Sequence, residues 1–164
     1  MSIQSIHFSW QVFESLEQVP ANLQPLIIQA REQTKISYAP YSHFHVGAVA
    51  LLNNGEIIKG TNQENASYPI GICAERTLLS AAATVFPEVG IKVMAISYFN
   101  HRPNERSDTP ISPCGMCRQA MFEFEERTST PIQILLTGQS GQIYLINRAA
   151  DLLPLAFSGA VLKD

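Results

Sequence analysis

The feature that most constrains the fold is the segment 91–99, IKVMAISYF, which is an almost unbroken apolar run. A strand of this composition is typical of a sheet that is covered on both faces. Helical and strand patterns alternate around it within 164 residues, a length that suits one domain. The alternation predicts an α/β domain in which a mixed sheet lies between two layers of helices.

Periodicity and turn residues predict the other elements. An Asn54–Gly55 turn between two apolar stretches predicts a hairpin within 45–61. Residues 1–20 are expected to form an N-terminal extension, either an extended segment or an added edge strand, before a single domain at 21–164. The remaining expected elements are helices near 21–37, 73–86, 115–127 and 148–153, strands near 132–137 and 142–147, and a surface loop at 100–112.

Composition excludes several classes of partner. The 11 Lys and Arg residues are scattered, and 14 Asp and Glu residues give a net charge of -3, so a nucleic-acid partner is not expected. No apolar run approaches the length of a membrane span, and the first residues lack the pattern of a signal peptide. We therefore expect no membrane partner and a cytoplasmic location, where three cysteines would not form a disulfide framework.

The cysteines form the clearest chemical pattern. Cys114 and Cys117 share one face at the start of a predicted helix, and Cys73 opens another helix two residues before Glu75. Helix starts stabilise thiolates, and three thiolates leave the fourth position of a zinc ion open, as in catalytic sites. Arg76 is a candidate cation beside this site. The spacing alone also allows a thioredoxin-like redox pair with an inert core cysteine.

Longer motifs around these cysteines resemble a known family. The stretches CAERT (73–77) and SPCGMCRQ (112–119) resemble the two signatures of the zinc-dependent nucleoside and nucleobase deaminases, with Cys in place of the usual His. YAPYSHFHVGA (38–48), GTNQENASYPIGICAERT (60–77) and LLPLAF (152–157) are similar to stretches of the small cytidine deaminases, in the same order.

The resemblance implies a fold and an activity. The fold would be a three-layer α/β/α cytidine deaminase-like domain with a mixed five-stranded central sheet. The activity would be hydrolytic deamination of cytidine and 2'-deoxycytidine, a pyrimidine salvage reaction that releases ammonia. It would need one Zn²⁺ per subunit, held by Cys73, Cys114 and Cys117, and Glu75 would carry protons from the activated water to the cytosine ring and the departing amine.

Further roles are implied residue by residue. Asn62 and Glu64 match the pair that binds the ribose 3'-hydroxyl, and Phe44 matches the aromatic residue that packs against the pyrimidine. The backbone near Cys73 and Ala74 would read the edge of the base.

The resemblance also implies a homotetramer whose active sites are completed by neighbouring subunits. Ala66, Tyr68 and Phe157 match positions that neighbours contribute. The chain is only 15% charged, against roughly 25% in an average soluble domain, and buried subunit interfaces are depleted in charge.

Arg118 and Arg76, each beside a proposed site residue, are expected to hydrogen-bond the zinc-bound sulfurs.

Three alternatives remain open at this stage. A deaminase of tRNA or single-stranded DNA would need a basic groove, and the ribose pair suits a free 3'-hydroxyl. Blasticidin-type deaminases share the cysteine signatures but lack the Asn-x-Glu-Asn stretch found at 62–65. A zinc-stabilised protein without catalytic activity would have no use for Glu75.

Overall fold

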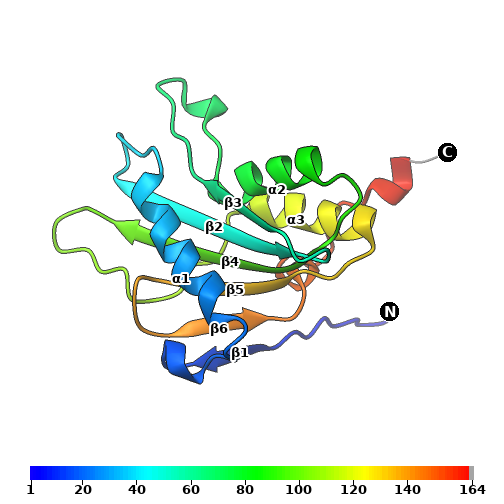
Figure 1. Ribbon diagram of the computed structural model, residues 1–164. Helices are drawn as coiled ribbons and strands as arrows, with labels where there is room; N and C mark the ends of the chain where they lie inside the picture. The colour runs from blue at the N-terminus through cyan, green and yellow to red at the C-terminus, as the bar shows by residue number, and fades with distance from the viewer. Residues whose placement is uncertain (163–164) are drawn as a thin grey trace.

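The computed structural model describes residues 1–162 and contains one six-stranded mixed sheet (Figure 1). The strand order is β1-β6-β5-β4-β2-β3, and only β4 and β5 run parallel. The main elements are β1 (Trp10–Phe13), α1 (Gln24–Gln33), β2 (Phe44–Leu52), β3 (Ile57–Thr61), α2 (Ala74–Val85), β4 (Ile91–Asn100), α3 (Gly115–Thr128), β5 (Gln133–Thr137) and β6 (Ile143–Ile146). Within residues 1–162, no helix is long and apolar enough to cross a membrane.

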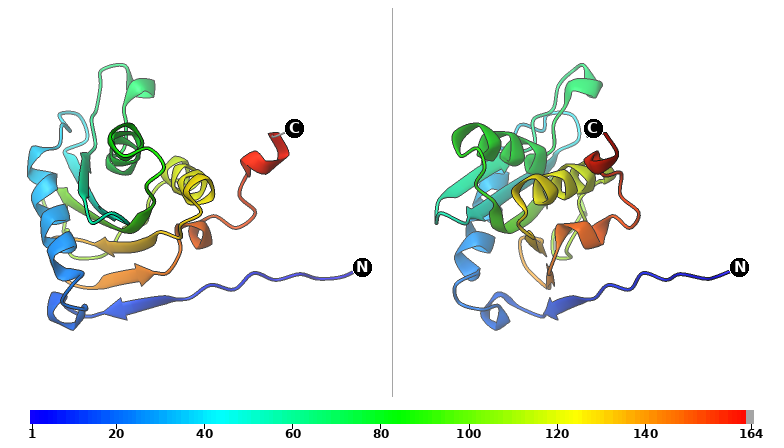
Figure 2. Two further views of the ribbon diagram at one scale, coloured as in Figure 1. Left: turned by 45° about the vertical axis from the view of Figure 1, so that its right-hand side comes forward. Right: turned by 90° about the vertical axis from the view of Figure 1, so that its right-hand side faces the viewer.

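The expected number of five strands was wrong, because β1 adds a sixth. β1 pairs antiparallel with β6, with Trp10 opposite Ile146 and Phe13 opposite Ile143. The backbone of β6 would otherwise present unpaired N–H and C=O groups at the sheet edge. Residues before β1 run away from the body of the molecule as an extended segment (Figure 2).

Helices cover both faces of the sheet, as the apolar segment 91–99 predicts. α1 packs on one face, and α2 and α3 lie together on the other (Figure 2). Alternate residues of the same strand serve the two layers: Val49 of β2 packs with α1, and Ala50 packs with α2 and α3. The three-layer architecture is therefore confirmed.

Two glycines let the helices approach the sheet closely. A Cβ atom at Gly47 would collide with the Ala30 carbonyl oxygen of α1, and one at Gly60 would collide with the Ala74 carbonyl oxygen. Gly60 thus allows the first turn of α2, which carries Glu75, to lie directly on β3.

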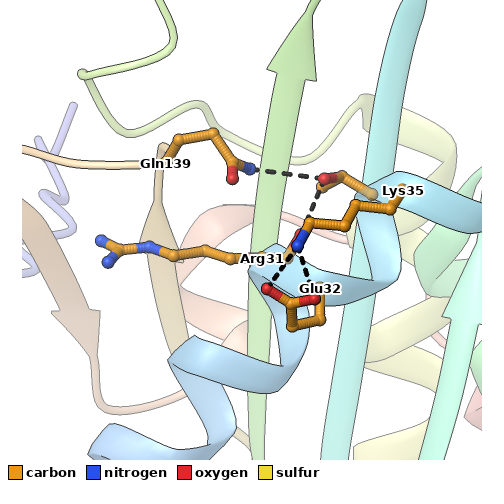
Figure 3. Close-up of polar contacts among 5 residues, drawn as sticks. Arg31, Glu32, Lys35 and Gln139 are labelled. Carbon is orange, nitrogen blue, oxygen red and sulfur yellow. Dashed lines mark hydrogen bonds and ion pairs between the residues drawn. The ribbon is translucent and has the colours of Figure 1, made fainter.

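Polar contacts also tie the end of α1 to the turn between β5 and β6 (Figure 3). The Gln139 amide donates to Thr34 Oγ1 at 3.5 Å and to the Tyr98 carbonyl oxygen at 2.9 Å. Arg31 donates from Nε to the Gly138 carbonyl oxygen at 2.9 Å. Side-chain hydrogen bonds therefore fix the position of α1 on the sheet.

Candidate active site

The three cysteines meet where the first turns of α2 and α3 lie side by side. Cys73 and Cys114 are the residues before these two helices, and Cys117 lies one turn into α3. The Cys73 and Cys114 sulfurs are 3.8 Å apart, the Cys114 and Cys117 sulfurs are 3.4 Å apart, and all three lie within 4.8 Å of one another. A tetrahedral zinc with Zn–S bonds of about 2.3 Å separates its sulfurs by about 3.8 Å. The donor set and its spacing therefore fit a zinc ion.

The thiols of Cys73 and Cys117 differ in their pKa. A hydrogen bond from Cys117 lowers the pKa of Cys73 to about 6, an effect opposed by burial and by the Glu75 carboxylate. The reciprocal hydrogen bond, together with burial, raises the pKa of Cys117 above its ordinary value. One thiolate thus forms readily, and the second is disfavoured beside it. A divalent cation would relieve this repulsion, because metals bind cysteine as thiolate.

Glu75 lies in the first turn of α2 and is not one of the clustered ligands. Its side chain is 4% exposed, and burial raises the pKa of the carboxyl group above its ordinary value. It also lines the cavity in front of the sulfurs. A buried carboxyl group with a raised pKa, next to a reaction cavity, is suited to gain and lose a proton.

The cavity measures about 430 Å³, a size that suits a small organic molecule. The predicted site residues in its wall are Phe44, Asn62, Glu64, Tyr68, Cys73, Glu75 and Cys114. The other wall residues are Ser42, Val46, Gln63, Gly71, Ile72, Ile96, Ile111, Ser112 and Pro113. The cavity therefore has the zinc ligands at one point of its wall and polar side chains from the 62–64 segment at another.

Asn62 and Glu64 are held by the backbone of β2 and of the turn before it. Asn62 Oδ1 accepts from the Val46 amide at 2.7 Å, and Nδ2 donates to the Phe44 carbonyl oxygen at 2.9 Å. Glu64 accepts from the Tyr41 and Ser42 amides at 2.9 and 3.2 Å and from the Ser42 hydroxyl. Burial raises the pKa of Glu64, but these hydrogen bonds outweigh it and hold the pKa below its ordinary value. The carboxylate is therefore fixed and ionised.

Two residues that support the site were not anticipated from the sequence. Tyr98 of β4 stacks on Phe44, with ring centroids 5.1 Å apart and an interplanar angle of 18°. The Ser42 hydroxyl contacts Glu64 and accepts from the Phe44 amide at 3.0 Å. Ser42 lies inside the YAPYSHFHVGA motif and could have been found there, whereas only the pairing of β2 with β4 brings Tyr98 behind Phe44.

Other predicted residues lie around the cavity or behind it. Ala74 is buried at the start of α2, and Cys117 is buried behind the other two sulfurs. Ala66 and Phe157 are not among the residues that line the cavity, and Phe157 is 62% exposed. This chain alone does not bring Ala66 and Phe157 into its own cavity.

The two arginines act differently. Arg76 contributes positive charge that lowers the pKa of Cys73. Arg118 donates from Nε to the Pro113 carbonyl oxygen at 2.8 Å and from Nη1 to the Leu152 carbonyl oxygen at 3.0 Å. The guanidinium of Arg118 therefore braces the turn that carries Cys114, and these two bonds run to carbonyl oxygens instead of sulfurs.

Known proteins are similar to this chain in sequence and in fold. Residues 21–130 match the family described as the cytidine and deoxycytidylate deaminase zinc-binding region. A cytidine deaminase of Halalkalibacterium halodurans is 40% identical over 139 residues, which are 84% of this chain and 92% of that protein. The crystal structure of a cytidine deaminase from Burkholderia pseudomallei has a TM-score of 0.70 and 38% identity, and it covers 81% of this chain and 97% of its own.

A blasticidin-S deaminase of Bacillus cereus is more distant, at 26% identity over 133 residues, which are 81% of this chain and 90% of that protein.

The family match covers both cysteine signatures and the 62–64 segment, and the sulfur cluster has the spacing of a zinc site. The chain therefore belongs to the cytidine and deoxycytidylate deaminase family.

Proposed function

We propose that this protein is a zinc-dependent enzyme that deaminates cytidine and 2'-deoxycytidine to uridine and 2'-deoxyuridine, with release of ammonia. The observation that carries the proposal is the pairing of a three-thiol cluster with a buried, non-ligand carboxyl group in one cavity. A structural zinc site needs no such carboxyl group, and it usually has a fourth protein ligand. The arrangement supports a hydrolytic enzyme over a zinc-stabilised binding protein.

Cys73, Cys114 and Cys117 would hold the zinc ion, which when bound supplies a water molecule of lowered pKa as the nucleophile. Glu75 is the proton carrier of this site. Its raised pKa lets it accept a proton, deliver it to N3 of the cytosine ring and later supply one to the departing amine. The first turn of α2 also offers backbone N–H groups near Ala74, which have no partner within the helix and can bind the edge of the base.

The polar pair of Asn62 and Glu64 retains one hydrogen-bond donor and one acceptor, which are the two groups that a bound hydroxyl requires. Of about four lone-pair positions on a carboxylate, the bonds to Glu64 occupy three, which leaves one acceptor. Of the two amide hydrogens of Asn62, one is used, which leaves one donor. A hydroxyl both donates and accepts, so this pair suits the ribose 3'-hydroxyl, with Phe44 packed against the pyrimidine.

We further propose a homotetramer that acts in the cytoplasm, where the three thiols stay reduced for metal binding. Large apolar residues are exposed near the cavity, with Ile70 at 66% and Met116 at 64%, and on the C-terminal segment, with Phe157 at 62%. Packing against identical neighbours would cover them. Ala66 and Phe157 would then serve the site of a neighbouring subunit, as would Tyr68, which also lines the cavity of its own chain.

Deamination of blasticidin S is the second candidate, favoured by the likeness to the Bacillus cereus enzyme. The hydroxyl-binding pair at Asn62 and Glu64 supports a ribonucleoside or deoxyribonucleoside instead.

A spectrophotometric assay tests the proposal. Zinc-loaded protein is offered cytidine, 2'-deoxycytidine, cytosine, adenosine and blasticidin S, with and without a chelator. We expect turnover of the two cytidine nucleosides and its loss on chelation. Failure with both nucleosides would refute the proposal, and turnover of blasticidin S alone would establish the second candidate.

A further inference from the structure

Ser42 contacts the Glu64 side chain and the backbone of Phe44. Its hydroxyl donates to Glu64 and accepts from the Phe44 amide at 3.0 Å, and its amide donates to Glu64 at 3.2 Å. Phe44 is also held by its pairing with Asn100 of β4 and by the Asn62 amide on its carbonyl oxygen. A shift of Ser42 would therefore act mainly on the Glu64 carboxylate.

The turn that carries Ser42 does not have a relaxed backbone. His43 adopts a left-handed conformation with φ of 56°, which a residue with a side chain rarely occupies. Such a conformation persists only where neighbouring contacts hold it. The His43 amide donates to the Ala39 carbonyl oxygen at 3.1 Å within the turn, and the His43 carbonyl oxygen accepts from the His101 amide at 2.9 Å. One of its two supports thus comes from the segment after β4.

That segment, the loop 101–112, carries a second support. Arg102 donates from Nε to the Ser42 carbonyl oxygen at 3.0 Å. The loop is itself anchored in its middle, because the Ser107 hydroxyl accepts from the Asn100 amide at 2.9 Å and the Ser107 carbonyl oxygen accepts from the Gln139 amide at 2.6 Å. Arg102 therefore reaches the turn from an anchored loop.

We propose that Arg102 is a positioning residue for substrate binding, which acts through Ser42 to hold Glu64 in place for the ribose 3'-hydroxyl. This inference rests on the proposed function of the site. It assigns a role to the first part of the loop 101–112, whose last two residues, Ile111 and Ser112, line the cavity. Arg102 does not line the cavity, so its effect reaches the substrate only through the turn.

The inference predicts an effect that depends on the substrate. Cytidine has the 3'-hydroxyl that Glu64 would bind, and 3'-deoxycytidine lacks it. In Arg102→Ala, KM for cytidine should rise about three- to tenfold while kcat changes less than about twofold. KM for 3'-deoxycytidine should stay within about twofold, because the weakened contact is already absent. A merely structural role for Arg102 would raise KM for both substrates.

The matched control is Arg106→Ala in the same loop. The Arg106 side chain is 84% exposed and pairs with Asp108, so its loss should leave both KM values unchanged. Arg102→Lys keeps a cationic donor for a single carbonyl oxygen, so its KM for cytidine should lie between those of the parent enzyme and Arg102→Ala. If Arg102→Ala loses its fold, Arg102→Met keeps the apolar part of the side chain without a hydrogen-bond donor and serves the same comparison of two substrates.

Equal changes in KM for the two nucleosides, or no change for cytidine, would overturn the role of Arg102 while leaving the proposed function intact. A zinc-loaded parent enzyme that leaves cytidine unchanged would instead refute the proposed function and this inference with it.

Discussion

The two faces of the sheet use alternate residues of the same strands for different purposes. On the face covered by α2 and α3, Phe44 and Glu75 border an open cavity, and the hydrogen-bonding capacity of the polar pair is only partly used. On the α1 face, Gly47 is pressed against the helix, and Gln139 bonds across to Thr34 and Tyr98. The α1 face is therefore tightly packed, whereas the face of α2 and α3 retains polar groups that are free to bind a substrate.

The largest expected effect lies on the cavity face, at Glu75. Glu75→Gln should lower kcat by about 10²–10⁴-fold, because the amide cannot carry a proton through the reaction. Zinc content should be unchanged, since Glu75 is not a ligand, and the melting temperature should not fall, since a buried carboxyl group with a raised pKa is removed. Steady-state kinetics and metal analysis check this.

The control for this change is Glu56→Gln, which makes the same substitution at an exposed residue outside the cavity. It should leave kcat unchanged. Full activity in Glu75→Gln would refute the proton-carrier role.

The next effect lies on the α1 face and concerns stability. Gly47→Ala should lower the free energy of unfolding by about 1–3 kcal/mol, because the added methyl group collides with the backbone of α1. Denaturant unfolding measures it, with Gly159→Ala as control, where the nearest atom is a flexible Glu123 carboxylate oxygen at 3.5 Å. A large loss of kcat in folded Gly47→Ala would break the division between the two faces.

A smaller effect is expected behind the cavity wall, at Tyr98. Tyr98→Leu removes the ring that stacks on Phe44 and should raise KM for cytidine about two- to tenfold. Tyr98→Phe keeps the stacked ring and should bind cytidine like the parent enzyme. If the two variants have the same KM, the stacking does not position Phe44.

The smallest effect is a pH dependence on the α1 face, at His45. Burial lowers the pKa of His45, and the nearby His101 and His43 lower it further, against opposing contributions from Ser37 and Glu64. The unfolded chain therefore takes up this proton first, so stability should fall as the pH drops through the ordinary histidine pKa of about 6.5.

His45→Gln should show a smaller fall in melting temperature between about pH 8 and pH 5.5 than the parent protein. His7→Gln, in the exposed N-terminal segment, is the control and should show the parent's fall. An unchanged pH dependence in His45→Gln would show that His45 protonation does not contribute.

Much of this protein was determined by local sequence. The Asn54–Gly55 turn, the apolar β4 and the starts of α2 and α3 follow from short-range preferences, so they were predictable from residues alone. The residue types and spacing of the cysteines also indicated a zinc site, because Cys114 and Cys117 share one face of a helix and helix starts stabilise the thiolate form that binds metal.

Only the tertiary structure decided how distant segments meet. The pairing of β1 with β6, the stack of Tyr98 on Phe44 and the contact of Arg102 with Ser42 join residues that are far apart in the chain. Arg118 likewise reaches carbonyl oxygens that its position beside Cys117 did not suggest. These contacts depend on strand order and loop path, which the packing of the whole chain sets and no local preference encodes.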